Sequence, residues 1–207
     1  MSRLRLGVMV SGRGSNLQAI IDQIESGRLD AEIAVVVSNR ANVAALERAK
    51  RHGVPTAVFE RAEFASRHER DMAMTRCLRE ARLDLVVMAG YDQLVADELL
   101  NEFAGRIINI HPSLLPAFAG GLHAQADAVE YGVKISGCTV HFVTVGPADG
   151  GPIILQKAVP VYDDDTGDTL SARILEEEHR LLPEAIRLFG QGRIVVNGRK
   201  TTIKPAN

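Results

Sequence analysis

The sequence predicts an α/β fold with a mostly parallel, twisted sheet, and three patterns indicate it. In the N-terminal half of the 207-residue chain, short β-branched runs alternate about four times with longer segments of helical periodicity. Some short runs, such as residues 33–37, are apolar throughout, as in a strand that is covered on both faces. The C-terminal half has two strand-like runs joined by a Gly/Pro-rich loop and a later Asn-Gly turn, which predict antiparallel strands there.

The elements of the N-terminal half follow in strand–helix order. Residues 4–10 form the first strand, and a helix over residues 16–26 follows because apolar residues recur at i, i+3, i+4 and i+7 from Leu17 onward. Further strands are predicted at residues 33–37, 56–59, 85–89 and 106–110, and further helices at residues 43–52, 64–82 and 95–103. Helices then cover both faces of the sheet in a Rossmann-like arrangement. The loops after the strands gather at one edge, where we expect ligands.

The C-terminal half shows a different order of elements. The predicted elements are a helix at residues 123–132, strands at residues 138–143 and 153–159, and a long helix at residues 169–189. Pro183 is expected to disturb that helix, and Asn197-Gly198 between two β-rich runs predicts a terminal hairpin. Because no repeat, low-complexity tract or linker interrupts the chain, we expect a single domain over residues 1–207.

Composition excludes several classes of function. With 24 basic and 26 acidic residues the net charge is −2, which argues against a general nucleic-acid binder. No apolar run reaches the ~18 residues that span a bilayer, and the start of the chain is typical of a strand, so no membrane partner or signal peptide is expected. Cys77 and Cys138 are isolated, which favours two free thiols in a reducing cytoplasm over disulfides or a zinc site.

A glycine-rich loop, residues 11–16, lies between the first strand and the first helix. Such a loop at a helix N-terminus offers free backbone N–H groups to a phosphate. The chain has no Gly-Lys-Ser/Thr for a Walker loop, and Leu17 replaces the third glycine of a dinucleotide fingerprint. Two interpretations stay open: a single phosphate bound by Gly14, Ser15 and Asn16, or a glycine turn followed by an Asn or Ser N-cap.

The end of the fifth strand carries an amide and an imidazole. Side chains alternate along a strand, so Asn109 and His111 point to the same face, and Pro112 ends the ladder. This is the carboxyl end of a parallel strand, where α/β sheets place their chemistry. The alternative is a structural hydrogen bond by the histidine, which is the commoner role of a lone histidine.

Asp149 lies in the Gly/Pro-rich loop between two later strands. Asp-Gly is ordinary turn chemistry, but a carboxylate beside His111 would also favour its charged form. Asn109, His111 and Asp149 together suit direct acyl transfer to an amine. Asn109 and His111 would donate to the oxyanion, and Asp149, directly or through water, would relay the proton of the amine. The histidines and cysteines show no ligand spacing, so no metal is expected.

At these residues the sequence resembles the phosphoribosylglycinamide formyltransferases of the folate-dependent formyltransferase superfamily, over about residues 6–189. The segments that carry the resemblance are residues 11–18, 109–116, 137–143 and 149–153 and the pair Glu178-His179. The resemblance implies transfer of the formyl group of 10-formyltetrahydrofolate, as co-substrate, to the glycine amine of 5-phosphoribosylglycinamide in de novo purine biosynthesis. The amine would attack directly, through a tetrahedral intermediate.

The resemblance also assigns residues. The catalytic residues implied are Asn109, His111 and Asp149; the phosphoribosyl group would bind at Gly14, Ser15, Asn16 and Glu178; and the folate would bind at Arg67, Asp92, Gln93, Leu94, Val95 and Asn109. The half over about residues 1–105 would bind phosphate, and residues 106–207 would supply catalysis and folate binding. We expect small-molecule substrates only, a cytoplasmic protein, and a monomer or homodimer. His141 is expected to make a structural hydrogen bond that locks a loop.

Three departures from the family pattern stand out. The family often has Met-Arg where this chain has Asp92-Gln93, and the segments 119–123 and 145–148 are each one residue longer than usual. The alternatives are therefore another 10-formyltetrahydrofolate-dependent formyltransferase or hydrolase, or a degenerate folate- or nucleotide-binding module.

Overall fold

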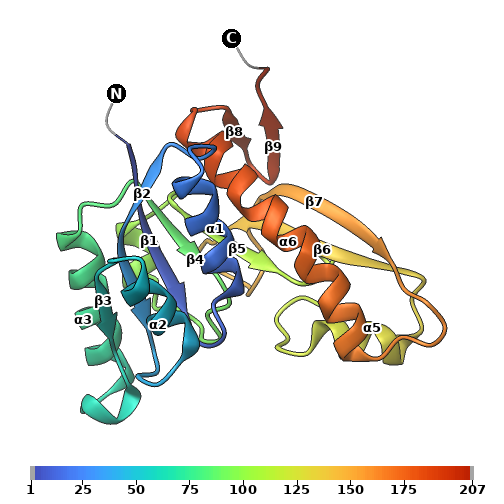
Figure 1. The fold of residues 1–207 in the computed structure, drawn as a ribbon, viewed down its shortest axis with the longest axis horizontal. Coiled ribbons are helices and arrows are strands. Elements are labelled where there is room, and N and C mark those ends of the chain that lie inside the picture. Colours follow the sequence, from blue (N-terminus) through green and yellow to red (C-terminus); the bar gives the residue numbers. More distant parts are fainter. Residues whose placement is uncertain (1–2, 206–207) are drawn as a thin grey trace. The chain divides into compact units, whose positions relative to one another are not determined.

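The computed structural model describes residues 3–205 (Figure 1). The large sheet has the strand order β3-β2-β1-β4-β5-β6-β7, and a two-stranded sheet joins β8 and β9. The predicted fold class, a mostly parallel α/β sheet with antiparallel strands in the C-terminal half, is confirmed. The chain divides into two compact units, Met1–Ile108 and Asn109–Asn207, which we describe separately.

The first unit is a parallel sheet with its connecting helices. Its strands are β1 (Leu4–Val10), β2 (Ala31–Ser38), β3 (Thr56–Val58), β4 (Leu85–Met88) and the start of β5 (Ile107–His111). Its helices are α1 (Ser15–Glu25), α2 (Ala44–Arg51), η1 (Arg61–Glu63), α3 (Arg67–Glu80) and α4 (Asp97–Glu102). β1 pairs in parallel with both β2 and β4, so its residues are buried from Leu6 onward. A Cβ at Gly7 would lie 2.3 Å from Leu83 Cδ1, so the glycine permits this close packing.

Three helices of this unit are shorter than predicted: α2 loses one residue at each end, and α3 and α4 lose more. α3 begins at Arg67 because the Ser66 hydroxyl accepts the Glu69 N–H at 3.0 Å, a regular N-cap, and the residues before it form a 3₁₀ turn. α4 covers only Asp97–Glu102, so the segment after β4 is a longer loop than the periodicity indicated. That loop contains residues 92–95, four of the residues that the resemblance assigns to folate.

The second unit packs a long helix against antiparallel strands. Its elements are the end of β5, α5 (Ala124–Tyr131), β6 (Ile135–Phe142), β7 (Ile153–Pro160), α6 (Gly167–Gly190), β8 (Ile194–Asn197) and β9 (Lys200–Ile203). β6 and β7 pair antiparallel around the loop that holds Asp149. α6 starts at a capping box of Thr166 and Thr169 and continues through Pro183, so the expected disturbance does not end the helix.

The C-terminal hairpin is confirmed, with its turn one residue later than predicted. Asn197 pairs with Lys200, so the two loop residues are Gly198 and Arg199, with a φ of 59° at the glycine. The turn contacts the Asp149 loop, because Arg199 Nη1 donates to the Gly150 carbonyl at 2.7 Å. In the part of the chain that the structure describes, no helix has the length and apolar character to cross a bilayer.

Candidate active site

The carboxylate of Asp149 lies at the centre of a cluster of polar groups in the second unit. Its Oδ1 lies 3.3 Å from His141 Nε2 and accepts from Asn109 Nδ2 at 3.4 Å. Its Oδ2 lies 3.3 Å from His111 Nδ1 and accepts the backbone N–H of Gly120 at 2.8 Å. Each oxygen therefore faces two nitrogen groups. The structure brings Asn109, His111 and Asp149 together, as the strand alternation and the resemblance suggested.

The local backbone explains why Asp149 can face this cluster. Asp149 has a φ of 55°, in the left-handed region that aspartate tolerates better than most residues. The Gly150 N–H closes a turn on the Pro147 carbonyl at 3.0 Å. A Cβ at Gly151 would lie 1.8 Å from the Phe142 carbonyl oxygen, so only glycine fits there. The glycines allow the loop to fold back tightly enough to present the carboxylate.

His111 has a defined tautomer. Its Nε2 lies 2.9 Å from the Phe118 carbonyl oxygen, which can only accept, so Nε2 carries a proton. Nδ1 faces Asp149 and becomes a second donor when the ring is protonated. The expected donation by His111 to an oxyanion is therefore possible only after Phe118 releases Nε2. The imidazole is buried.

His141 belongs to the same cluster, although the sequence favoured a purely structural role for it. Its Nδ1 lies 2.9 Å from the carbonyl oxygen of Phe142, which makes that nitrogen the donor and locks the ring against the loop, as expected. Its Nε2 lies 3.2 Å from Asn109 Nδ2 and faces Asp149. A neutral ring accepts from Asn109, whereas a protonated ring donates to Asp149. Local patterns gave no signal for this placement, because β6 lies beside β5 only through the strand order of the sheet.

The surroundings of Asp149 favour its charged form. Burial of the side chain opposes ionisation, but the hydrogen bond with His141, the Gly120 N–H and the two histidine charges outweigh it. Together they lower the pKa of Asp149 from 3.8 to about 2. The carboxylate is thus ionised throughout the neutral range and can attract a proton that leaves an amine.

The two lengthened segments meet at this carboxylate. Gly120, in the segment 119–123, has a φ of 73° and gives its N–H to Asp149, which directly follows the segment 145–148. The extra residues therefore leave the predicted cluster intact. Within residues 3–205, no group of three or more His, Cys, Asp or Glu is arranged to hold a metal ion, and Cys77 and Cys138 are both free.

The glycine loop of the first unit does not have the Asn or Ser cap that one of the two open interpretations required. Gly14 itself is the N-cap of α1, with a φ of 71°, and no side chain caps the helix. A Cβ at Gly14 would lie 2.6 Å from Ala45 Cβ, so glycine is required. Ser15 and Asn16 are the first helical residues, and their backbone N–H groups belong to the turn that has no intrahelical acceptor. Of the two open interpretations, this geometry favours the anion site.

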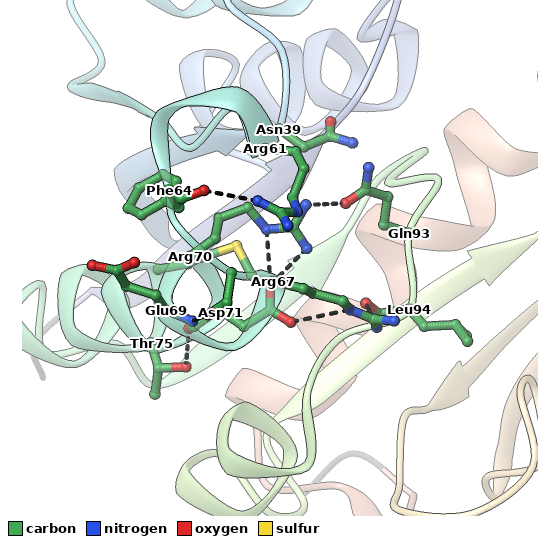
Figure 2. Close-up of polar contacts among 12 residues, drawn as sticks. Asn39, Arg61, Phe64, Arg67, Glu69, Arg70, Asp71, Thr75, Gln93 and Leu94 are labelled. Atoms are coloured by element: carbon green, nitrogen blue, oxygen red, sulfur yellow. Dashed lines mark hydrogen bonds and ion pairs between the residues drawn. The ribbon is translucent and has the colours of Figure 1, made fainter.

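Four of the residues that the resemblance assigns to folate, Arg67, Asp92, Gln93 and Leu94, have protein partners in the first unit. Figure 2 shows the contacts of Arg67, Gln93 and Leu94. Arg67 Nη2 donates to the Leu94 carbonyl at 2.9 Å, and the Asp92 carboxylate accepts from Asn39 at 2.9 Å. Gln93 Oε1 accepts from Arg70. Val95 is half-buried in the same loop, and Leu94 is 64% exposed. Sequence reasoning missed Arg70, which lies 23 residues before Gln93 in the chain.

Glu178, the remaining predicted site residue, lies on α6 of the second unit. Its side chain is buried in the middle of the helix, between the helical positions Ile174 and Leu182, which are also buried. A buried glutamate on the apolar face of a helix is uncommon.

Comparisons with known proteins identify the family of this chain. The formyl transferase family model matches residues 4–186. The phosphoribosylglycinamide formyltransferase of Haemophilus influenzae is 43% identical over 92% of this chain and 89% of its own length. The human trifunctional purine biosynthetic protein adenosine-3 is 42% identical over 98% of this chain. The chain spans only 14–20% of such trifunctional relatives.

A solved structure is similar over nearly the whole chain. Glycinamide ribonucleotide transformylase 1 from Symbiobacterium toebii has a TM-score of 0.94 and 53% identity, and the match covers 98% of this chain and 94% of that one. The family model and the single-function relative both match most of this chain, and the fold agrees with that of the solved structure. The chain therefore belongs to the formyl transferase family.

Proposed function

We propose that this protein is a phosphoribosylglycinamide formyltransferase. It transfers the formyl group of 10-formyltetrahydrofolate to the glycine amine of 5-phosphoribosylglycinamide, a step of de novo purine biosynthesis. The observation that carries this proposal is the cluster around Asp149, in which one carboxylate faces Asn109, His111 and His141. This set combines oxyanion donors with a proton acceptor and needs no side-chain nucleophile.

In the proposed reaction the amine attacks the formyl carbon, and a tetrahedral oxyanion forms. Asn109 Nδ2 and His111 Nε2 are the N–H donors for that oxyanion. The new C–N bond leaves a proton on the attacking nitrogen, and the Asp149–histidine pair accepts it. N10 of the folate takes up a proton as its bond to the formyl carbon breaks, so the reaction is balanced. Asp149 keeps its charge at neutral pH because its pKa is lowered to about 2.

The present contact of His111 suggests where the formyl oxygen binds. Phe118 places a carbonyl oxygen 2.9 Å from Nε2, which is the position that an acceptor oxygen of the substrate would take. Phe118 must release this N–H before the formyl oxygen can accept it. The segment near Gly120 therefore moves when substrate binds, while Nδ1 stays on Asp149.

Other residues are assigned to substrate binding within this proposal. The backbone N–H groups at Gly14, Ser15 and Asn16 would hold the substrate phosphate, which the absence of a side-chain cap on α1 supports. Glu178 would hold the phosphoribosyl group. Arg67, the segment 92–95 and Asn109 would bind the folate. No metal is assigned to the reaction.

The same proposal keeps one formyltransferase domain over residues 1–207. Its N-terminal half, about residues 1–105, binds phosphate, and the remainder supplies the catalytic cluster. Small molecules are its expected partners, with no nucleic acid or membrane, as a monomer or homodimer. The cytoplasm is its expected compartment, since two separate free cysteines are typical of a reducing environment.

The experiment that tests the function follows folate absorbance with purified protein, 10-formyltetrahydrofolate and a series of amines. We expect turnover that depends on 5-phosphoribosylglycinamide and is absent with methionyl-tRNA. Formate release without any amine would instead identify a hydrolase. Tight folate binding without turnover would identify a binding module. A His111→Ala variant that transfers formyl groups at the parental rate would contradict the mechanism.

A further inference from the structure

The first unit contains a buried ion pair that the proposed chemistry does not use. Arg70 and Asp71 on α3 are each only 2% exposed. Removing two charges from water costs several kcal/mol per ion, and their attraction repays this only when the geometry is good and further hydrogen bonds are made. A pair of this kind is weak evidence for stability alone. The other hydrogen bonds of Arg70 and Asp71 therefore indicate the role of this ion pair.

Asp71 holds two arginines, one on each oxygen. Arg70 donates to Asp71 Oδ1 from both Nε (2.9 Å) and Nη2 (2.6 Å). Arg67 Nε donates to Asp71 Oδ2 at 3.4 Å. The backbone of Asp71 is fixed as well, because the Thr75 hydroxyl donates to its carbonyl at 2.7 Å. Figure 2 shows both guanidinium groups directed from α3 toward the loop after β4.

The two arginines contact consecutive residues of that loop. Arg70 Nη1 donates to the side-chain oxygen of Gln93, and Arg67 Nη2 donates to the backbone carbonyl of Leu94 at 2.9 Å. Since guanidinium groups can only donate, Gln93 must turn its oxygen toward Arg70. The buried carboxylate of Asp71 thus orients both arginines, and each arginine holds one residue of the loop.

Asp92, the residue before Gln93, is also held by hydrogen bonds. Its carboxylate accepts from Asn39 at 2.9 Å and from Arg40 at 2.5 Å, and its N–H donates to the Ser11 hydroxyl at 3.0 Å. Three successive residues are thus held by side chains from three other segments. The same loop leaves Leu94 64% exposed. A loop that is rigid and partly apolar at its surface suits a preorganised binding site.

We propose that Arg70 is a positioning residue for the folate co-substrate. Gln93 and Asp92 replace the Met-Arg that the family often has, so this loop carries no cation of its own at either position. Arg70 supplies a guanidinium from α3 instead and, through Gln93, sets the backbone of residues 92–95. This inference rests on the proposed function, because it assumes that the loop binds a reduced folate.

The test is a set of four variants with both substrates titrated separately. Arg70→Met removes the guanidinium, and Gln93→Met removes the oxygen that it contacts while the Arg70–Asp71 pair stays intact. Gln93→Glu keeps an oxygen for Arg70, and Arg70→Met/Gln93→Met completes a double-mutant cycle. The matched control is Gln191→Met, because Arg187 Nη1 donates to Gln191 Oε1 at 3.1 Å in an exposed Arg–Gln contact on another helix.

We expect Arg70→Met and Gln93→Met each to raise the KM for 10-formyltetrahydrofolate about tenfold, or ~1.4 kcal/mol. The KM for the phosphoribosyl substrate and kcat should stay within about twofold. The double variant should be no worse than either single variant. Gln93→Glu should raise the folate KM less than Gln93→Met does, and Gln191→Met should match the parent. Calorimetric binding of tetrahydrofolate should weaken in parallel, a readout that does not need turnover.

Other results overturn the inference. An unchanged folate KM in Gln93→Met, additive effects in the double variant, or equal rises in both KM values would each show that Arg70 only supports the fold. If Arg70→Met does not fold, the folate KM of Gln93→Met compared with that of Gln93→Glu tests the inference by itself. A parental protein without formyl transfer would refute the proposed function, whereas an active parent with unaffected variants refutes this inference.

Discussion

Two aspartates in this molecule have similar surroundings and different chemistry. Asp149 lies between two histidines in the second unit, and Asp71 lies between two arginines in the first. Arginine stays protonated at every relevant pH, so the Asp71 cluster is a permanent set of contacts. Histidine gains and loses protons near neutrality, so the Asp149 cluster can move a proton. The cation that faces a carboxylate thus determines whether the cluster holds a loop or takes part in a reaction.

The backbone around each aspartate fits this difference. Asp71 is in the middle of α3, where helical hydrogen bonds fix it, and its side chain is 2% exposed. Asp149 lies in a glycine-rich loop with a left-handed φ of 55°, and its side chain is 13% exposed. A reactive carboxylate needs access to substrate, and a loop supplies it. A positioning carboxylate needs rigidity, which a helix supplies.

The largest expected effect is on catalysis at Asp149. Asp149→Asn keeps the size of the side chain and tolerates the positive φ, but it removes the charge that accepts the proton. We expect kcat for formyl transfer to fall at least about a hundredfold, since acid–base groups typically contribute that much. Steady-state kinetics with saturating substrates measure this. A kcat within a few-fold of the parent would remove Asp149 from the mechanism.

The equivalent change at Asp71 should act on stability instead. Asp71→Asn leaves Arg70 buried without its counter-charge, which typically costs about 3 kcal/mol or more. Urea denaturation should show this loss, while kcat of the remaining folded enzyme stays within a few-fold of the parent. A fall in kcat as large as that of Asp149→Asn would contradict the view that the Asp71 cluster only holds a loop.

The pH dependence of stability gives a finer comparison. The pKa of Asp149 is lowered from 3.8 to about 2, so its ionised form stabilises the folded state. This contribution, on the order of 2 kcal/mol, is fully present above about pH 4 and disappears as the pH falls toward 2. The difference in unfolding free energy between the parent and Asp149→Asn should therefore shrink as the pH falls from about 4 toward 2. A difference that grows over this acidic range would contradict the assigned sign.

The smallest effect is expected at the C-terminal hairpin. Arg199→Ala removes the hydrogen bond to the Gly150 carbonyl, next to Asp149. Such a bond contributes about 1 kcal/mol, so kcat should fall roughly fivefold through a less ordered Asp149 loop. Lys200→Ala, at the adjacent exposed position, is the control and should change nothing. Equal kinetics for both variants would show that the hairpin does not support the loop.

Much of the fold and half of the cluster follow from local sequence patterns. Alternation along β5 predicts that Asn109 and His111 share a face, and periodicity predicts α1 and most other helices. His141 was assigned only a structural bond because strand order is a long-range property that local patterns do not contain. The partners of Asp92 and Gln93 were missed for the same reason, since Asn39, Arg40 and Arg70 are distant in the chain.

The contact between His111 and the Phe118 carbonyl has a consequence for the energy of substrate loading. A backbone acceptor already keeps the proton on Nε2, so the ring does not need to exchange tautomers before the reaction begins. When a formyl oxygen replaces that carbonyl, one hydrogen bond is exchanged for another of the same kind. In the proposed reaction the ring of His111 then needs no separate reorientation, and the change on substrate loading falls on the backbone of the Phe118 segment.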